Sequence, residues 1–210
     1  MIPVVDQTGL SQKNKTELGR HVVFDCYSTP IERRWLKAIV VRNDGGTDYT
    51  GYWTADVTVD ADGIVRDIEA FIILNRSYLP TLEEMKETLS HEYGHHVTLS
   101  YMLMSFNVAD DLQQLLKTRA PVDYYRARNI EDTYAQAAPF YELGWCNCDK
   151  ELLAEDYRVL FTTSTRPHRM AELSPENTVA RGAPPAIARD WIWRLFQPQA
   201  VGEKAWPFPT

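Results

Sequence analysis

The segment HEYGHH, residues 91–96, constrains this chain more than any other feature, because it lies late in a long predicted helix that begins after Pro80. Residues four apart in an α-helix point to nearly the same side, about 40° apart around the axis. His91 and His95 therefore lie one turn apart on one face of the helix. Two imidazoles placed in this way can bind the same cation.

Glu92 supplies a base beside the two histidines. It lies about 100° around the helix from His91, close enough to reach a water molecule on the cation without binding the cation itself. This is the HExxH arrangement of zinc hydrolases. Residues 81–84 form a predicted capping box, and a mainly apolar stripe lies opposite the histidines. The stripe consists of Leu82, Met85, Leu89, Tyr93, His96, Ser100 and Leu103.

Two neighbours of the ligands have other predicted roles. His96 lies about 120° from the mean direction of His91 and His95, within the apolar stripe, so we expect a core histidine rather than a ligand. Gly94 costs about 1 kcal/mol in a helix relative to alanine, which indicates that another part of the molecule approaches the backbone there.

The composition is that of a globular chain of one domain. Hydrophobic residues make up 44% and charged residues 24% of the 210 positions. The net charge of −7 predicts no basic surface, so we expect neither nucleic acid nor an anionic membrane as a partner. No stretch suits a membrane span, and the first residues lack the basic and apolar parts of a secretory signal. We therefore expect a cytoplasmic protein, and the sequence indicates no oligomeric state.

The cysteines agree with a reducing compartment. Cys26, Cys146 and Cys148 are odd in number, and two of them are only one residue apart, which argues against a disulfide framework. Cys146 and Cys148 are an alternative pair of ligands for a soft metal. A structural zinc site normally needs four ligands, however, and no CxxC partner occurs in the sequence.

The first half of the chain predicts a sheet. We expect residues 1–19 as a loose arm, residues 21–27 as a strand, and residues 31–41 as either a helix after Pro30 or a continuing strand. Alternation from residue 53 to 59 and again from 64 to 74, around Asp62 and Gly63, predicts a β-hairpin. The alternative for this turn is a calcium loop using Asp60, Asp62, Gly63 and Glu69. Arg66 within the loop and the strand-like flanks oppose it.

The second half predicts helices, at residues 110–118, 130–138, 151–161 and 185–196, followed by an extended tail over 203–210. The expected fold class is therefore α+β. We expect a single domain over residues 1–210, with a sheet-containing N-lobe over about 20–105 and a mostly helical C-lobe over about 106–210. The predicted active-site cleft lies between these lobes.

The third ligand must come from outside the histidine helix, because a catalytic zinc usually takes three protein ligands and keeps one position open. The best candidate is Glu151, in the first turn of a helix for which Asp149 is the predicted N-cap. Glu155, one turn on, can accept a hydrogen bond from the far nitrogen of His91 or His95. The alternatives are a solvated acidic face and, as a different ligand, His168 in a proline-broken turn.

The two motifs together resemble a known family. HEYGHH followed later by ELLAEDYR is similar to the gluzincin metallopeptidases, in the branch that contains the anthrax lethal factor catalytic domain and the bacterial Pro-Pro endopeptidases. The resemblance implies that His91, His95 and Glu151 bind zinc, that Glu92 is the general base, and that Glu155 supports a ligand. It also implies a zincin-like fold in which the hairpin supplies an edge strand to the cleft.

The chain departs from this family at one position. Lethal factor has a tyrosine seven residues before its glutamate ligand, where it helps to stabilise the oxyanion, and the corresponding position here is Gly144. Tyr141 is the nearest substitute, and Tyr134 is another. We assign the oxyanion role to Tyr141, since a phenol can donate a hydrogen bond to a tetrahedral oxygen.

The function predicted from the sequence is that of a zinc-dependent endopeptidase, with one zinc ion per chain and a peptide or protein as substrate. One alternative is a regulatory metalloprotease of the IrrE type, or a SprT-like protease that uses a third histidine as ligand. Another is a zinc-containing module that binds a protein segment without catalysis. The presence of Glu92 favours an enzyme.

Overall fold

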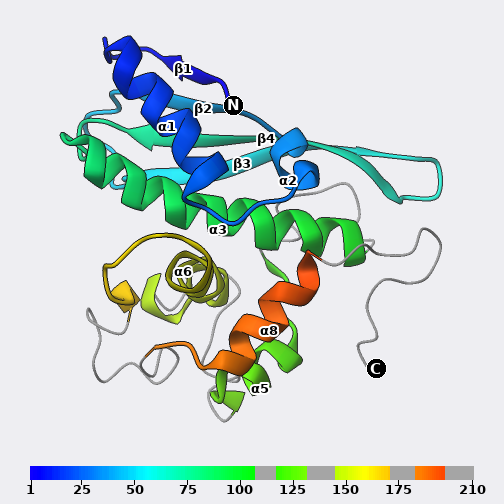
Figure 1. Cartoon of the computed structure of the whole chain (residues 1–210). Helices are drawn as coiled ribbons and strands as arrows, with labels where there is room; N and C mark the ends of the chain where they lie inside the picture. Colours follow the sequence, from blue (N-terminus) through cyan, green and yellow to red (C-terminus); the bar gives the residue numbers. More distant parts are fainter. Residues whose placement is uncertain (107–116, 132–144, 171–182, 197–210) are drawn as a thin grey trace.

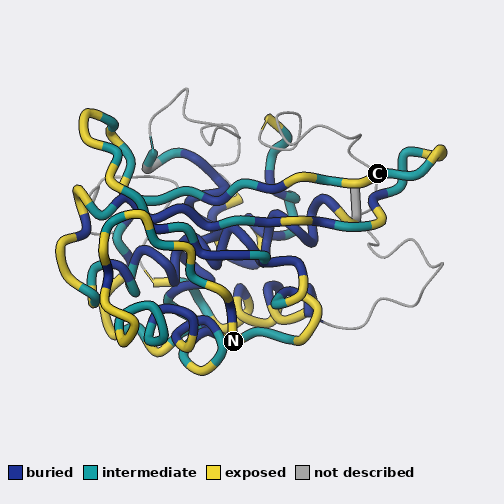
Figure 2. The backbone as a smooth tube through the Cα atoms, turned by 90° about the horizontal axis from the view of Figure 1, so that it is seen from above, coloured by how far each residue is buried: buried dark blue, intermediate teal, exposed yellow. Residues whose placement is uncertain are grey.

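The computed structural model describes residues 1–106, 117–131, 145–170 and 183–196. These residues form an α+β fold built around one mixed sheet. Figure 1 shows the sheet at one side of the molecule, helix α3 (Leu82–Phe106) beneath it, and the C-terminal helices on the other side of α3. Helix α3 is thus the middle layer, which explains why it is buried along most of its length (Figure 2).

The sheet has the strand order β1-β2-β4-β3. Its strands are β1 (Val4–Asp6), β2 (Leu36–Arg42), β3 (Gly51–Val59) and β4 (Val65–Asn75). Strand β2 runs parallel to β1 and β4, and β3 pairs antiparallel with β4. The predicted hairpin is confirmed, with Gly63 at φ 74° in its turn, and β3 is an edge strand of the described sheet.

The hairpin turn differs from the calcium loop that was the alternative for it. The Asp60 carboxylate accepts hydrogen bonds from the backbone N–H groups of Asp62 and Ile64, and it pairs with Arg66. Glu69 lies on β4 and pairs with Lys37 of β2, 3.4 Å away. The side chains of Asp60, in the turn, and Glu69, on β4, therefore both have protein partners.

The prediction for the N-terminus was wrong. Residues 4–6 form β1, and residues 21–24, expected in a strand, belong to helix α1 (Gln12–Phe24), which Ser11 caps. The run His-Val-Val-Phe is too short to distinguish a buried helix from a strand. The helix is stabilised by burial of Leu18 and Val22, one turn apart, against the core.

Residues 31–41 contain both of the structures considered for them. Helix α2 (Pro30–Trp35) begins with a complete capping box, in which Thr29 and Glu32 bind each other's backbone N–H groups. Strand β2 follows at once. No helix in the described part of the chain is long and apolar enough to cross a lipid bilayer.

The C-terminal helices agree in part with the prediction. Helices α6 (Asp149–Phe161) and α8 (Ala186–Leu195) match two predicted helices, whereas α5 (Val122–Arg128) was not anticipated. A short 3₁₀ helix, η3 (Trp145–Asn147), precedes α6. The segments predicted at 110–118 and 130–138 lie largely outside the described residues, and the tail at 203–210 lies wholly outside them.

Helices α3 and α6 approach each other closely at Gly94. A Cβ atom on Gly94 would lie 2.5 Å from the carbonyl oxygen and 2.9 Å from the Cα of Ala154. Both distances are shorter than real Cβ contacts, so only glycine fits there. The expectation that another backbone approaches Gly94 is met by α6, the helix that carries Glu151 and Glu155.

Substitution Gly94→Ala should lower the free energy of unfolding by about 1–3 kcal/mol, the usual cost of overpacking. The clash with rigid backbone outweighs the gain of about 1 kcal/mol from the better helix propensity of alanine. Urea unfolding followed by circular dichroism measures the change. Gly45→Ala is the matched control, because a Cβ on Gly45 has no atom within 4 Å. A Gly94→Ala variant as stable as the parent would contradict this close approach.

Candidate metal centre

Three buried side chains converge between α3 and α6. His91 and His95 extend from α3 and Glu151 from the first turn of α6, and their potential ligand atoms lie within 4.8 Å of one another. The Glu151 Oε2 atom is 2.8 Å from His91 Nε2 and 3.3 Å from His95 Nε2. Ligand bonds of about 2.0–2.1 Å in a tetrahedral site separate ligand atoms by about 3.3 Å. This group can therefore hold a metal ion after only small side-chain shifts.

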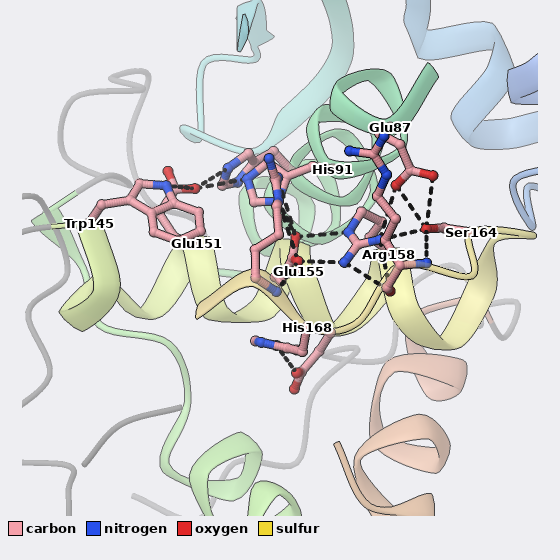
Figure 3. A network of polar contacts seen from close by, with 12 residues as sticks. Glu87, His91, Trp145, Glu151, Glu155, Arg158, Ser164 and His168 are labelled. Atoms are coloured by element: carbon pink, nitrogen blue, oxygen red, sulfur yellow. Dashed lines mark hydrogen bonds and ion pairs between the residues drawn. The ribbon is translucent and has the colours of Figure 1, made fainter. Parts of the chain in front are cut away.

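Glu155 fixes the orientation of the first histidine. Its Oε2 atom lies 2.9 Å from His91 Nδ1, so Nδ1–H donates to the carboxylate and Nε2 is directed at Glu151 (Figure 3). A histidine that binds a metal through one nitrogen usually donates its other N–H to a carboxylate in this way. The sequence left open which histidine Glu155 contacts, and the structure places it on His91.

The charges at this site agree with a bound cation. Burial would raise the pKa of Glu151, but the two histidines hold it well below its usual value. Burial and Arg169 would lower the pKa of His91, yet hydrogen bonds to Glu151 and Glu155 raise it to about 9. A proton on His91 thus compensates the carboxylates in the metal-free protein. A metal ion would take over this compensation, and its binding would release the proton.

The Glu155 carboxylate is itself held by two arginines. Arg158 donates from Nη2 to Oε1 over 2.6 Å and from Nε to Oε2 over 3.0 Å, and the backbone N–H of Arg169 donates to Oε1 over 2.8 Å. Arg158 also reaches Glu87 on α3 and the Ser164 hydroxyl (Figure 3). These contacts connect the loop after α6 to α3, and they stabilise the orientation of the carboxylate that contacts His91.

Glu92 lies beside this group without joining it. The side chain is buried, and among the described residues no hydrogen bond or ion pair involves it. Burial raises the pKa of Glu92 above its usual value. Gly51, the first residue of edge strand β3, lies so close that a Cβ there would be 3.2 Å from Glu92 Cγ. The HExxH glutamate is thus placed between the three converging side chains and the end of an edge strand.

His96 has the core role expected from its helical position. The indole N–H of Trp53 donates to its Nδ1 over 3.1 Å, and its Nε2–H donates to the carbonyl of Glu32 over 2.8 Å. Burial lowers the pKa of His96 to about 4, so the ring is neutral near pH 7. Both nitrogens are occupied, and His96 connects the sheet to α2.

His168, the alternative third ligand, belongs to a different cluster. Its Nε2 lies 2.9 Å from Asp156 Oδ1, and Asp156 also pairs with Arg128 of α5. His168 is therefore held away from the three converging side chains. Cys148 is buried as the N-cap residue of α6 and is not part of the metal-ligand group either. Tyr134, Tyr141 and the side chain of Cys146 lie outside the described residues.

A serine, a histidine and an aspartate form a second polar chain. His21 lies 2.8 Å from the Ser90 hydroxyl through Nε2 and 2.9 Å from Asp25 through Nδ1. The order resembles a hydrolytic triad, but Ser90 is only 1% exposed and lies inside a helix, where no substrate can reach it. These contacts attach α1 to the helix that carries the histidine ligands.

The sequence did not indicate Trp145 as part of the centre. Its indole N–H donates to Glu151 Oε2 over 2.7 Å (Figure 3). The guanidinium of Arg169 lies over the same ring, 5.8 Å from its centroid. The contact depends on the 3₁₀ helix before α6, which no motif in the sequence predicts, although an aromatic residue six positions before a candidate ligand was visible.

Substitution Glu151→Ala should abolish tight zinc binding, because it removes one of three ligands. Glu155→Ala should weaken zinc binding about 10–100-fold, the usual effect of losing the partner of a ligand. His168→Ala is the control and should leave zinc affinity unchanged, since His168 contacts Asp156. Titration against a competing chelator measures all three variants. Zinc retained by Glu151→Ala and lost by His168→Ala would show that the third ligand is the histidine.

No protein-family model, curated protein or solved structure matches this chain.

Proposed function

We propose that this chain is a zinc-dependent endopeptidase of the gluzincin type, with a zincin-like fold. The observation that carries the proposal is the convergence of His91, His95 and Glu151 from two helices, with Glu92 buried directly beside them. The two histidines and the glutamate come from segments about sixty residues apart, so the HExxH spacing by itself does not produce this convergence. The fold class is α+β, as this assignment requires.

Zinc fits the donor set. Two imidazole nitrogens and one carboxylate oxygen are the protein ligands of many catalytic zinc sites, in which a fourth position stays open. Magnesium and calcium prefer oxygen ligands throughout, and a Cu(I) site would use thiolate or thioether sulfur. We therefore propose one zinc ion per chain. Bound zinc supplies a Lewis acid and lowers the pKa of water toward about 7.

Glu92 is the proposed general base. Its carboxylate accepts the proton of the attacking water and passes it to the leaving amine. The side chain suits this role because it is buried beside the three converging side chains without belonging to their group. Tyr141 remains our candidate for stabilising the oxyanion, by donation from its phenol.

The substrate we propose is an extended peptide segment. Strand β3 is an edge of the described sheet, and its first residue, Gly51, lies beside Glu92. A peptide that pairs with an edge strand gains backbone hydrogen bonds and presents its carbonyl groups in a regular register. Pairing near Gly51 would bring a scissile bond close to Glu92.

Three other functions are alternatives to this proposal. A SprT-like protease would need a histidine as third ligand, and His168 is bound to Asp156 while His96 is occupied on both nitrogens. A zinc-containing module without catalysis needs no carboxylate beside the ligands, yet Glu92 is buried there despite the energetic cost. A regulatory protease of the IrrE type shares the proposed chemistry and differs in its substrate.

Substitution Glu92→Gln should keep zinc and the fold but lower peptidase activity by about 10²–10⁴-fold, because it removes a base without removing a ligand. Cleavage of a diverse peptide library, read by mass spectrometry, measures activity and also reports the preferred residues around the cut. Glu83→Gln is the matched control on the same helix, since the Glu83 side chain is 76% exposed. Equal cleavage by Glu92→Gln and the parent would refute this mechanism.

A further inference from the structure

Trp145 is a polar partner of the metal centre that the HExxH motif does not include. Its Nε1–H donates to Glu151 Oε2 over 2.7 Å. The same oxygen lies 2.8 Å from His91 Nε2 and 3.3 Å from His95 Nε2. The indole therefore contacts the carboxylate oxygen that lies closest to both histidine ligands.

The chemistry of the indole limits what Trp145 can contribute. An indole N–H is a donor only, it carries no charge, and it cannot bind a metal. Its hydrogen bond to Glu151 therefore serves to orient the carboxylate. A glutamate side chain has three rotatable torsions, and without a partner its carboxylate would lose conformational entropy on binding a metal. A hydrogen bond already present in the metal-free protein reduces this loss.

The surroundings of Trp145 hold the donor in place. The residue begins η3, and its carbonyl accepts a hydrogen bond of 3.1 Å from the N–H of Cys148, the N-cap residue of α6. Its ring centroid is 6.0 Å from that of His91 on α3, and the guanidinium of Arg169, which follows α6 in the chain, lies over the ring at 5.8 Å. The donor and the acceptor are thus connected by one hydrogen-bonded turn, and the ring lies between His91 and Arg169 as close neighbours.

We infer that Trp145 is a positioning residue for the Glu151 ligand, and that its indole N–H sets the metal affinity of the centre. This inference rests on the proposed metal site. The geometry favours positioning over contact with substrate, because the N–H is already directed at Glu151. Arg169 supports the two carboxylates of the site in different ways. Its guanidinium lies over the ring of Trp145, which binds Glu151, and its Nη2 lies 3.3 Å from Oε2 of Glu155 itself.

Substitution Trp145→Phe tests this inference, because it keeps an aromatic ring and removes the donor. Zinc affinity, measured against a competing chelator, should fall about 10–100-fold. The visible absorption bands of the Co²⁺-loaded variant should also differ from those of the Co²⁺-loaded parent, since these bands report ligand geometry directly. Trp193→Phe is the matched control, with the same chemical change at a residue 40% exposed on α8, and it should alter neither readout.

The outcomes separate this inference from the proposed function. A parent protein that binds no zinc refutes the metal site itself. A parent that binds zinc, with unchanged affinity and an unchanged cobalt spectrum in Trp145→Phe, overturns the role of Trp145 alone. Unchanged affinity with slower peptide cleavage also overturns it, because the N–H would then serve the substrate. Equal losses in Trp145→Phe and Trp193→Phe would mean a general loss of folding, which overturns the inference as well.

A measurement on the unaltered protein covers the case in which Trp145→Phe does not fold. The chain has six tryptophans, and labelling them with ¹⁵N makes each indole N–H visible by NMR. When Co²⁺ replaces Zn²⁺, the resonance of one indole N–H should shift far more than the other five, because the Trp145 N–H donates to a ligand of the paramagnetic ion. A spectrum without one strongly shifted indole resonance would contradict the inference.

Discussion

The close approach of α3 and α6 is the constraint on which the rest of the site depends. Only glycine at position 94 lets the two backbones meet, with the Ala154 carbonyl at the contact. The close packing of α6 against α3 brings Glu151 and Glu155 within hydrogen-bond range of His91. The two histidines alone would be an incomplete site. The ligand geometry is therefore a property of helix packing, and a site built on two rigid elements needs little reorganisation on binding a metal.

Burial of charge accounts for the polar network around this contact. The carboxylates of Glu151 and Glu155 lie in the core, where unpaired charges would cost several kcal/mol each. The positive charge of Arg158 compensates the charge of Glu155, and a proton on His91 compensates the remaining negative charge in the metal-free protein. A bound divalent cation would displace this proton and form stronger bonds to the ligands. The same network joins the loop after α6 to α3 through Glu87, so metal binding and tertiary structure are coupled.

The sequence predicted those parts of the fold and the site that local spacing determines. The hairpin, α3 and α6 follow from periodicity, and the capping box at Thr81 and Glu84 marks the start of α3. The predicted N-cap of α6 was wrong, because Asp149 is its first helical residue and Cys148 is the N-cap. The one-turn spacings within each helix place the ligand candidates. The identity of the helix before residue 25 was missed, because a short apolar run suits either structure. Trp145 and Arg169 were missed for a different reason. They reach Glu151 and Glu155 only after η3 and the loop beyond α6 have folded, and no sequence periodicity encodes such contacts.

The most direct test of the central claim is X-ray absorption spectroscopy at the zinc edge of the zinc-loaded protein. The account predicts a four-coordinate ion with only nitrogen and oxygen neighbours at about 2.0–2.1 Å, and with the outer-shell scattering of two imidazole rings. That result would agree with His91, His95 and Glu151 as the protein ligands. Scattering from sulfur at about 2.3 Å, or from three imidazole rings, would contradict the account, because cysteine or a third histidine would then be a ligand.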